Sequence, residues 1–209
     1  MRSLFNDTFT ASPRGGLSPH KGSIPYVTLI ACAIMLMLGV LPNSLVRLHS
    51  LSFDYGAIIE QQQYWRLITG HLIHSSWNHL LWDLTTFTVA AFYLEKQSPK
   101  LLIYGIVVSV TVLNLYLLSP LSSLESYAGI SGVLYTVITL AALFWYKKEP
   151  SLLGLVPLLM ILIKTVLELT AKNALFVTEG WSLYPPAHLI GAAIGITLWC
   201  IYRRKRSAA

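Results

Sequence analysis

Three groups of polar side chains interrupt the apolar parts of this chain, and each contains residue types that can do chemistry. The first is the Gly-Ile-Ser-Gly segment at residues 129–132. If Ser131 begins a helix, unpaired backbone N–H groups lie beside it, and its small neighbours let another backbone come close. Such a serine can act as a nucleophile, with the helix end stabilising an oxyanion. Taken alone, the motif would more often be a packing surface in a membrane helix.

The second group is centred on His188, which lies in a Pro-Pro-Ala-His-Leu-Ile-Gly segment. Ala187, Gly191 and Gly195 are spaced by four residues and form one small-residue stripe on a helix, which permits close contact with a neighbouring helix. A lone histidine here would more often be an interfacial side chain. The adjacent stripe, and a predicted depth that matches that of Ser131, favour His188 as the general base for the serine.

The third group contains His71, His74, Asn78, His79 and Asp83. His79 and Asp83 are four residues apart and share one face of a helix. Three histidines beside a carboxylate raise the question of a zinc site. However, the H-E-x-x-H pattern is absent, and no second cluster supplies a general-base glutamate. We therefore expect no metal and no other cofactor.

The elements that must position these groups are predicted from composition and hydropathy. Of the 209 residues, 55% are hydrophobic and only 11% are charged. Soluble domains carry about 25% charged residues, so this surface faces lipid. The sequence predicts an all-α membrane protein built as a six-transmembrane-helix bundle. The six apolar segments are 25–42, 71–94, 100–118, 129–146, 151–169 and 186–202.

The charged residues predict how the chain is oriented. Lys and Arg concentrate at both ends and in alternate connections, so both termini should be cytoplasmic. The net charge of +6 lacks a basic stripe with interleaved aromatic residues, which argues against a nucleic-acid partner. The predicted parts are a cytoplasmic N-terminal tail (1–24), a membrane domain (25–203) and a basic cytoplasmic tail (204–209). The connection 43–70 mixes aromatic and charged residues and is expected to be a loop at the membrane interface.

The predicted topology links the three groups. With six spans, the second, fourth and sixth all begin on the same outer side of the membrane. His79, Ser131 and His188 lie within about three helical turns of those beginnings, at a rise of about 1.5 Å per residue. We therefore expect the three side chains to lie at a similar depth below the outer surface.

At this point the chain resembles the rhomboid intramembrane serine proteases. Three blocks carry the resemblance, in the order in which the family has them. They are Tyr64-Trp65-Arg66-Leu67 followed by His71, His74, Trp77 and His79; the segment from Gly129 to Tyr135; and the segment from Ala187 to Gly191. The resemblance implies a bacterial inner-membrane enzyme whose active site opens on the periplasmic side and whose substrates are membrane-anchored proteins in the lipid bilayer.

The resemblance also implies a role for each matched residue. Ser131 would be the nucleophile and His188 the base, and members of the family work without an acidic third residue. The Ser131 backbone N–H and the His79 side chain would donate to the oxyanion. The remaining implied roles are stacking of Tyr135 on His188, room for the substrate carbonyl at Gly129, and anchoring of the first outer loop by Trp65 and Arg66.

Asp83 departs from the family, which usually has Asn at this position. An ionised aspartate cannot donate a hydrogen bond to an oxyanion and would repel the developing charge. Burial can keep a carboxyl group protonated. Alternatively, Asp83 holds His79 or another donor in place without touching the substrate. Both interpretations of Asp83 as a substrate-positioning residue stay open.

Segments 65–74 and 187–192 look most similar to the rhombosortase branch of the family. That branch is associated with trimming C-terminal Gly-Gly-type membrane tails from exported proteins. Residues 174–184 and the fifth span would then control lateral access of a substrate helix. Two alternatives are a catalytically inactive rhomboid relative that binds transmembrane clients, and a small transporter lined by the histidines and Asp83.

Overall fold

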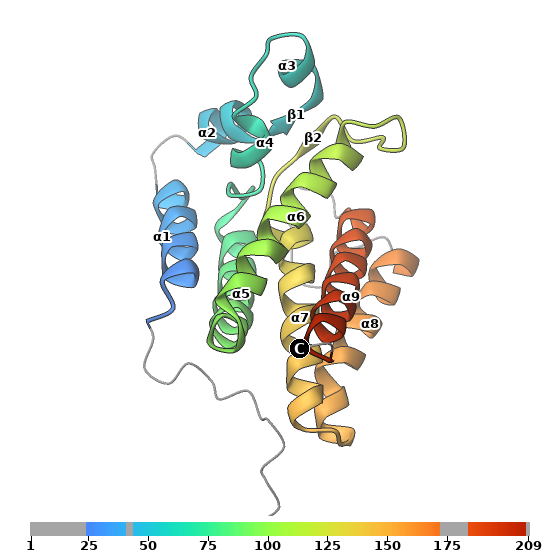
Figure 1. Cartoon of the computed structure of the whole chain (residues 1–209). Helices are drawn as coiled ribbons and strands as arrows, with labels where there is room; N and C mark the ends of the chain where they lie inside the picture. Colours follow the sequence, from blue (N-terminus) through green and yellow to red (C-terminus); the bar gives the residue numbers. More distant parts are fainter. Residues whose placement is uncertain (1–23, 41–43, 172–183, 208–209) are drawn as a thin grey trace, which may run out of the picture.

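The computed structural model describes residues 24–40, 44–171 and 184–207, which are helical apart from connecting segments and one two-stranded sheet (Figure 1). The long helices are α1 (Tyr26–Val40), α5 (Trp77–Gln97), α6 (Pro99–Leu117), α7 (Ser131–Lys148), α8 (Leu152–Ala171) and α9 (Pro185–Ser207). The short elements are α2 (Ser44–Leu51), β1 (Phe53–Asp54), α3 (Tyr55–Ile59), α4 (Arg66–Thr69) and β2 (Ser126–Tyr127).

Each of the six predicted spans corresponds to one long helix, but the predicted start of the second was wrong. We expected it to begin at residue 71, whereas α5 begins at Trp77. The Ser76 hydroxyl accepts a hydrogen bond from the His79 backbone N–H at 3.1 Å, which caps α5 at this point. Consequently, the first two histidines of the third group lie in a turn, and only His79 is on the helix.

Within the described residues, three helices are long and apolar enough to cross a membrane. They are α6, α8 and α9, over the ranges Pro99–Leu117, Leu152–Thr170 and Pro185–Lys205. α1 is a shorter apolar helix over Tyr26–Gly39. α5 carries His79, Asp83 and Glu95 among its apolar residues, and these side chains lower its mean hydropathy.

The predicted interfacial loop 43–70 is not a simple loop. It contains α2, β1, α3 and α4, which gather with β2 at one end of the bundle (Figure 1). β1 pairs antiparallel with β2, with Phe53 opposite Tyr127 and Asp54 opposite Ser126. This pairing fixes the segment that leads directly into the Gly-Ile-Ser-Gly motif.

Arg66 ties this part of the chain together. Its side chain is buried, and Nη1 donates to the carbonyl oxygens of His49 and Ser52, both at 2.8 Å. Buried guanidinium groups need such acceptors to offset lost hydration. The neighbouring Trp65 is more exposed, and its indole N–H reaches the carbonyl of Ser50 at 3.4 Å.

α7 lies in the middle of the bundle, with α5 on one side, α8 and α9 on the other, and α6 crossing in front (Figure 1). α7 and α9 form the most extensive helix pair in the described part of the chain. A Cβ atom added at Gly191 would overlap the Gly132 carbonyl oxygen, and one at Gly195 would lie 2.8 Å from the Cβ of Thr139. The predicted small-residue stripe is therefore confirmed as the face of α9 that contacts α7.

Glu95 attaches α1 to the rest of the bundle. This buried carboxylate, near the end of α5, accepts hydrogen bonds from the backbone N–H groups of Val27 and Thr28 at 2.9 and 2.8 Å and from the Thr28 hydroxyl at 2.6 Å. A carboxylate is favoured at a helix N-terminus because the N–H groups there lack partners within the helix.

We expect Gly191→Ala to destabilise the protein by about 1–3 kcal/mol or more, because the added methyl group forces α9 away from the Gly132 carbonyl. Thermal unfolding in detergent micelles measures the effect. Ala193→Val, which enlarges a side chain on the exposed face of the same helix, is the matched control and should change the midpoint little. Equal midpoints for the two variants would show that the α7–α9 contact does not need glycine at 191.

Candidate active site

The first turns of three helices meet at one place in the structure. Ser131 is the first residue of α7, and His79 and His188 lie in the first turns of α5 and α9. Gly129 packs against the His79 ring so closely that a Cβ atom there would lie 2.8 Å from Cε1 of His79. Gly132 contacts the start of α9 in a similar way. The two glycines on either side of Ser131 therefore lie against the starts of α5 and α9.

Gly129 has a backbone conformation that favours glycine. Its φ angle is +123°, in the region that L side chains rarely adopt. Its N–H donates to the carbonyl of Gly70 at 3.0 Å, so the segment before α7 is held to the turn before α5. A side chain at this position would be strained and would also displace His79.

Ser131 is half-buried, and its side chain lies near the hydroxyl of Tyr127. The same hydroxyl accepts the Gly132 backbone N–H at 3.3 Å. Burial raises the pKa of Tyr127 to about 12, so this hydroxyl is neutral at physiological pH. Ser131 and His188 make no direct hydrogen bond in the described part of the chain. Sequence reasoning missed Tyr127, which approaches Ser131 only because β2 pairs with β1.

His188 is buried and stacks on Tyr135. The ring centroids are 4.3 Å apart, and the ring planes differ by 9°. Tyr135 follows Ser131 by four residues and therefore lies on the same face of α7, one turn further on. The stacking holds the imidazole along the helix face from which Ser131 projects.

Glu168 contacts His188 and is the main site residue that sequence reasoning missed. Nδ1 of His188 lies 2.8 Å from Oε2 of Glu168, a carboxylate on α8 whose residue is 0% exposed. The Tyr135 hydroxyl donates to the same oxygen at 3.2 Å, and Lys164 pairs with the other oxygen. The sequence did hold a signal for this site, because Lys164 and Glu168 are two charged residues four apart in an apolar predicted span.

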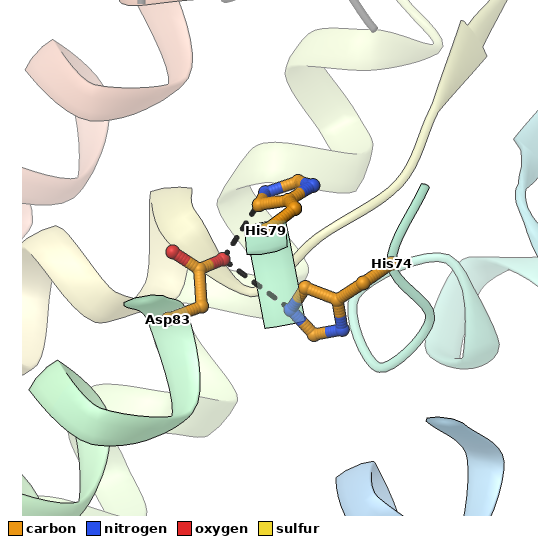
Figure 2. A group of neighbouring side chains, drawn as sticks. All are labelled: His74, His79 and Asp83. Atoms are coloured by element: carbon orange, nitrogen blue, oxygen red, sulfur yellow. Dashed lines mark ion pairs between the residues drawn. The ribbon is translucent and has the colours of Figure 1, made fainter. Parts of the chain in front are cut away.

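His74, His79 and Asp83 form a second cluster beside Gly129 (Figure 2). Nε2 of each histidine lies 3.3 Å from the same carboxylate oxygen, Oδ2 of Asp83. Nδ1 of His79 lies 3.2 Å from the Ser75 hydroxyl. Figure 2 shows both imidazoles turned toward the carboxylate, so Asp83 is a direct neighbour of His79.

The same three residues are the described group that can hold a metal ion. One ligand atom from each lies within 4.8 Å of the others. Two imidazoles and a carboxylate are ligand types that zinc accepts. The carboxylate also offers the two buried imidazoles a negatively charged partner, so the cluster has an electrostatic explanation within the protein itself.

His71 is separated from this cluster in its contacts. It lies in the turn between α4 and α5, and its Nε2 is 3.2 Å from Oδ1 of Asn114 on α6. Burial lowers the pKa of His71 to about 4, although the Asn114 contact acts in the opposite direction. Asn114 in turn donates to the carbonyl of Leu67 at 2.7 Å, which links α6 to α4.

A profile of the Rhomboid domain matches residues 61–205. The chain belongs to the rhomboid family. Rhomboid family members are intramembrane serine proteases that act on membrane proteins within the bilayer, and some members are inactive. The match and the apolar helices indicate a membrane protein. The matched region runs from just before α4 into the last turn of α9 and contains every site residue described above. No curated protein sequence matches this rhomboid chain.

The low pKa of His71 predicts a pH-dependent stability. The unfolded chain binds a proton here below about pH 6.5 and the folded chain only near pH 4, so stability present above pH 6.5 is lost as the pH falls toward 4. The maximum loss from this group is about 3 kcal/mol. His71→Gln, which cannot titrate, should lose less thermal stability than the wild type between pH 7.5 and 5. Equal losses would contradict this assignment.

Proposed function

We propose that this rhomboid is an active intramembrane serine endopeptidase that uses Ser131 as nucleophile and His188 as general base. The observation that carries the proposal is the position of His188, which stacks on Tyr135 one helical turn after Ser131. Ser131 also begins α7, where backbone N–H groups lack helical partners and can stabilise negative charge.

In the proposed reaction, His188 takes the Ser131 hydroxyl proton while the oxygen attacks the peptide carbonyl carbon. The tetrahedral intermediate collapses by breaking the C–N bond, and His188 returns the proton to the leaving amine. Water, deprotonated by the same imidazole, then hydrolyses the ester on Ser131. Ser131 and His188 are not hydrogen-bonded in the described structure, so the serine hydroxyl must turn toward His188 before the attack.

The oxyanion would be stabilised by the Ser131 backbone N–H and by His79, which lies against Gly129. We assign Asp83 the supporting role, because its carboxylate contacts His79 and His74. As an acceptor it favours the tautomer in which Nε2 of His79 carries a proton. This N–H would turn from Asp83 to the oxyanion as negative charge develops there. The negative charge of Asp83 is balanced when one of the two imidazoles is protonated.

An apolar cavity of about 800 Å³ between α5, α7 and α8 supports substrate access from the lipid side. Its lining includes Val89 and Ala90 of α5, Ile138 and Ala141 of α7, and Met160 and Lys164 of α8. A transmembrane segment could approach through this space, with α8 as the moving element. Of the segment 174–184, predicted to share this role, only Tyr184 lies among the described residues.

The proposed substrates are C-terminal membrane tails of the Gly-Gly type on exported proteins, as in rhombosortases. A regular helix hides its carbonyl groups in internal hydrogen bonds, so a scissile segment must unwind before Ser131 can reach it. Glycine pairs favour this unwinding because glycine is the weakest helix former after proline.

The proposed topology has six spans, both termini in the cytoplasm and a site facing the periplasm, with tails at 1–24 and 204–209. The bundle supports it in one respect. α5, α7 and α9 begin with site residues whose first turns meet. Because α5, α7 and α9 begin at the same end of the bundle, α6 and α8 must run in the opposite direction between them. This is the arrangement expected if each of the five helices crosses the membrane.

We expect Ser131→Ala and His188→Ala each to reduce cleavage of a co-reconstituted tail-anchored substrate by at least about 10³-fold, because the two residues act as one unit. Ser123→Ala and His49→Ala remove exposed side chains of the same types outside the site and are the matched controls. Cleavage that survives both site variants would overturn the proposed function.

A fluorophosphonate probe separates the proposed protease from an inactive client-binding relative. The wild type should be labelled covalently and Ser131→Ala should not, because the probe reacts only with an activated serine. Absence of Ser131-dependent labelling in folded protein would favour the binding role.

For Asp83 we expect Asn to retain most of the activity and Ala to lose about 10²-fold, the usual effect of losing one oxyanion donor. Asn keeps an acceptor oxygen for one imidazole, whereas Ala leaves His79 without its partner. The ratio of kcat/KM for the two variants is the measurement. Full activity of Asp83→Ala would remove Asp83 from the oxyanion site.

A further inference from the structure

Glu168 occupies a position where an unpaired carboxylate would be costly. The residue is fully buried in the second half of α8, a mostly apolar helix whose other charged residue is Lys164. Burying an ionised carboxylate requires opposite charges or hydrogen-bond donors. All three of its recorded partners are donors: His188 and Tyr135 at Oε2, and Lys164 at Oε1.

We propose that Glu168 is a positioning residue for the base, so that Ser131, His188 and Glu168 act as a triad. This inference rests on the proposed protease function, and it adds a third residue to the proposed pair of Ser131 and His188. An ionised carboxylate can only accept hydrogen bonds, so Nδ1 of His188 must carry the proton. Nε2 is then left with the lone pair that the serine proton requires.

The same contact stabilises the charge that develops during the reaction. When His188 takes the serine proton it becomes an imidazolium in a buried place, where an isolated charge is costly. The Glu168 carboxylate lies 2.8 Å from that ring and offsets the cost. Before the reaction, Lys164 balances the charge of the Glu168 carboxylate.

The carboxylate and Tyr135 together determine the orientation of the imidazole. The Tyr135 ring lies parallel to it, and the Tyr135 hydroxyl donates to the same oxygen that contacts Nδ1. Rotation of the imidazole would therefore break both the stacking and the hydrogen bond. If Glu168 served only as the ion-pair partner of Lys164, four residues before it, its second oxygen Oε2 would not need to contact His188.

Glu168→Gln tests the proposal with little change in volume. Lys164 is a donor, so the amide oxygen should turn toward it and the NH₂ group toward His188. Nδ1 must then accept a hydrogen bond from this NH₂ group, so the ring proton is on Nε2. Nε2 then has no lone pair with which to take the serine proton. We expect kcat/KM for a tail-anchored substrate to fall by about 10²–10⁴-fold, mainly through kcat.

Two further measurements separate positioning from a structural role. In Glu168→Gln, the acid limb of the residual activity should move to lower pH, because the His188 imidazolium has lost its anionic partner. The other titratable groups beside His188 and Glu168 are Tyr135 of α7 and Lys164 of α8. Adding Lys164→Met to Glu168→Gln removes the competing donor and frees the amide to turn its oxygen to His188. This double variant should recover at least about 10-fold of the lost activity.

Glu95→Gln is the matched control, because it neutralises another buried carboxylate, whose described hydrogen-bond partners lie in α1 and do not include His188. It should lower the thermal midpoint without moving the pH profile. Glu168→Asp, which keeps the charge, should be more active than Glu168→Gln and keep the wild-type acid limb, and it serves if the Gln variant fails to fold.

The outcomes distinguish the two proposals. Ser131-dependent cleavage that is equally fast in the wild type and in folded Glu168→Gln, or that falls equally in the Asp and Gln variants without a shift of the acid limb, would overturn the role of Glu168 alone. Cleavage that persists in Ser131→Ala would overturn the proposed function, and the triad with it.

Discussion

The close approach of α7 and α9 is the constraint on which the site depends. Glycines at 132 and 191 bring the two backbones together, and Thr136 donates from α7 to the Gly191 carbonyl at 2.8 Å. At this separation the His188 ring reaches the face of Tyr135. Because lipid offers no hydrophobic driving force between helices, such packing and buried hydrogen bonds must hold the pair. A wider spacing would leave the histidine without a stacking partner and far from Ser131.

Each of the three buried carboxylates in the described part of the bundle lies among cationic or hydrogen-bonding partners, because unpaired charges are costly there. Asp83 lies between two imidazoles, and Glu168 lies among a lysine, a tyrosine and a histidine. Glu95 accepts the first N–H groups of α1. Glu95 and Glu168 contact helices other than their own, so these two clusters also hold the helices in register. Two of the three lie beside the proposed reacting groups, where charge must appear and disappear during the reaction.

The segment between α1 and α5 contributes geometry rather than chemistry. The β1–β2 pair brings Tyr127 close to the start of α7, and the Gly70 carbonyl holds Gly129 against His79. Arg66 stabilises this segment from within by bonding two of its carbonyl groups. A short sheet and one buried arginine thus set the path of the chain into α7. This explains why residues far from the spans matter for the placement of Ser131.

The sequence by itself determined the helical membrane class, the six long helices and the candidate residues Ser131, His188 and His79. Apolar length, small-residue spacing and motif order are local properties that can be read along the chain. The start of α5 was missed because a serine cap, rather than hydropathy, ends the preceding turn.

Only the tertiary structure decided which carboxylate meets which histidine. Asp83 was predicted to lie on the His79 face, but its second partner, His74, comes from a turn outside the helix. Glu168 is twenty residues from His188 and on another helix, so no periodicity connects the two. Their contact depends on how α8 packs beside α7 and α9, and such packing results from the shapes of many side chains together. The stripe on α9 predicted that a neighbour would come close, and the fold alone determined that α7 is this neighbour.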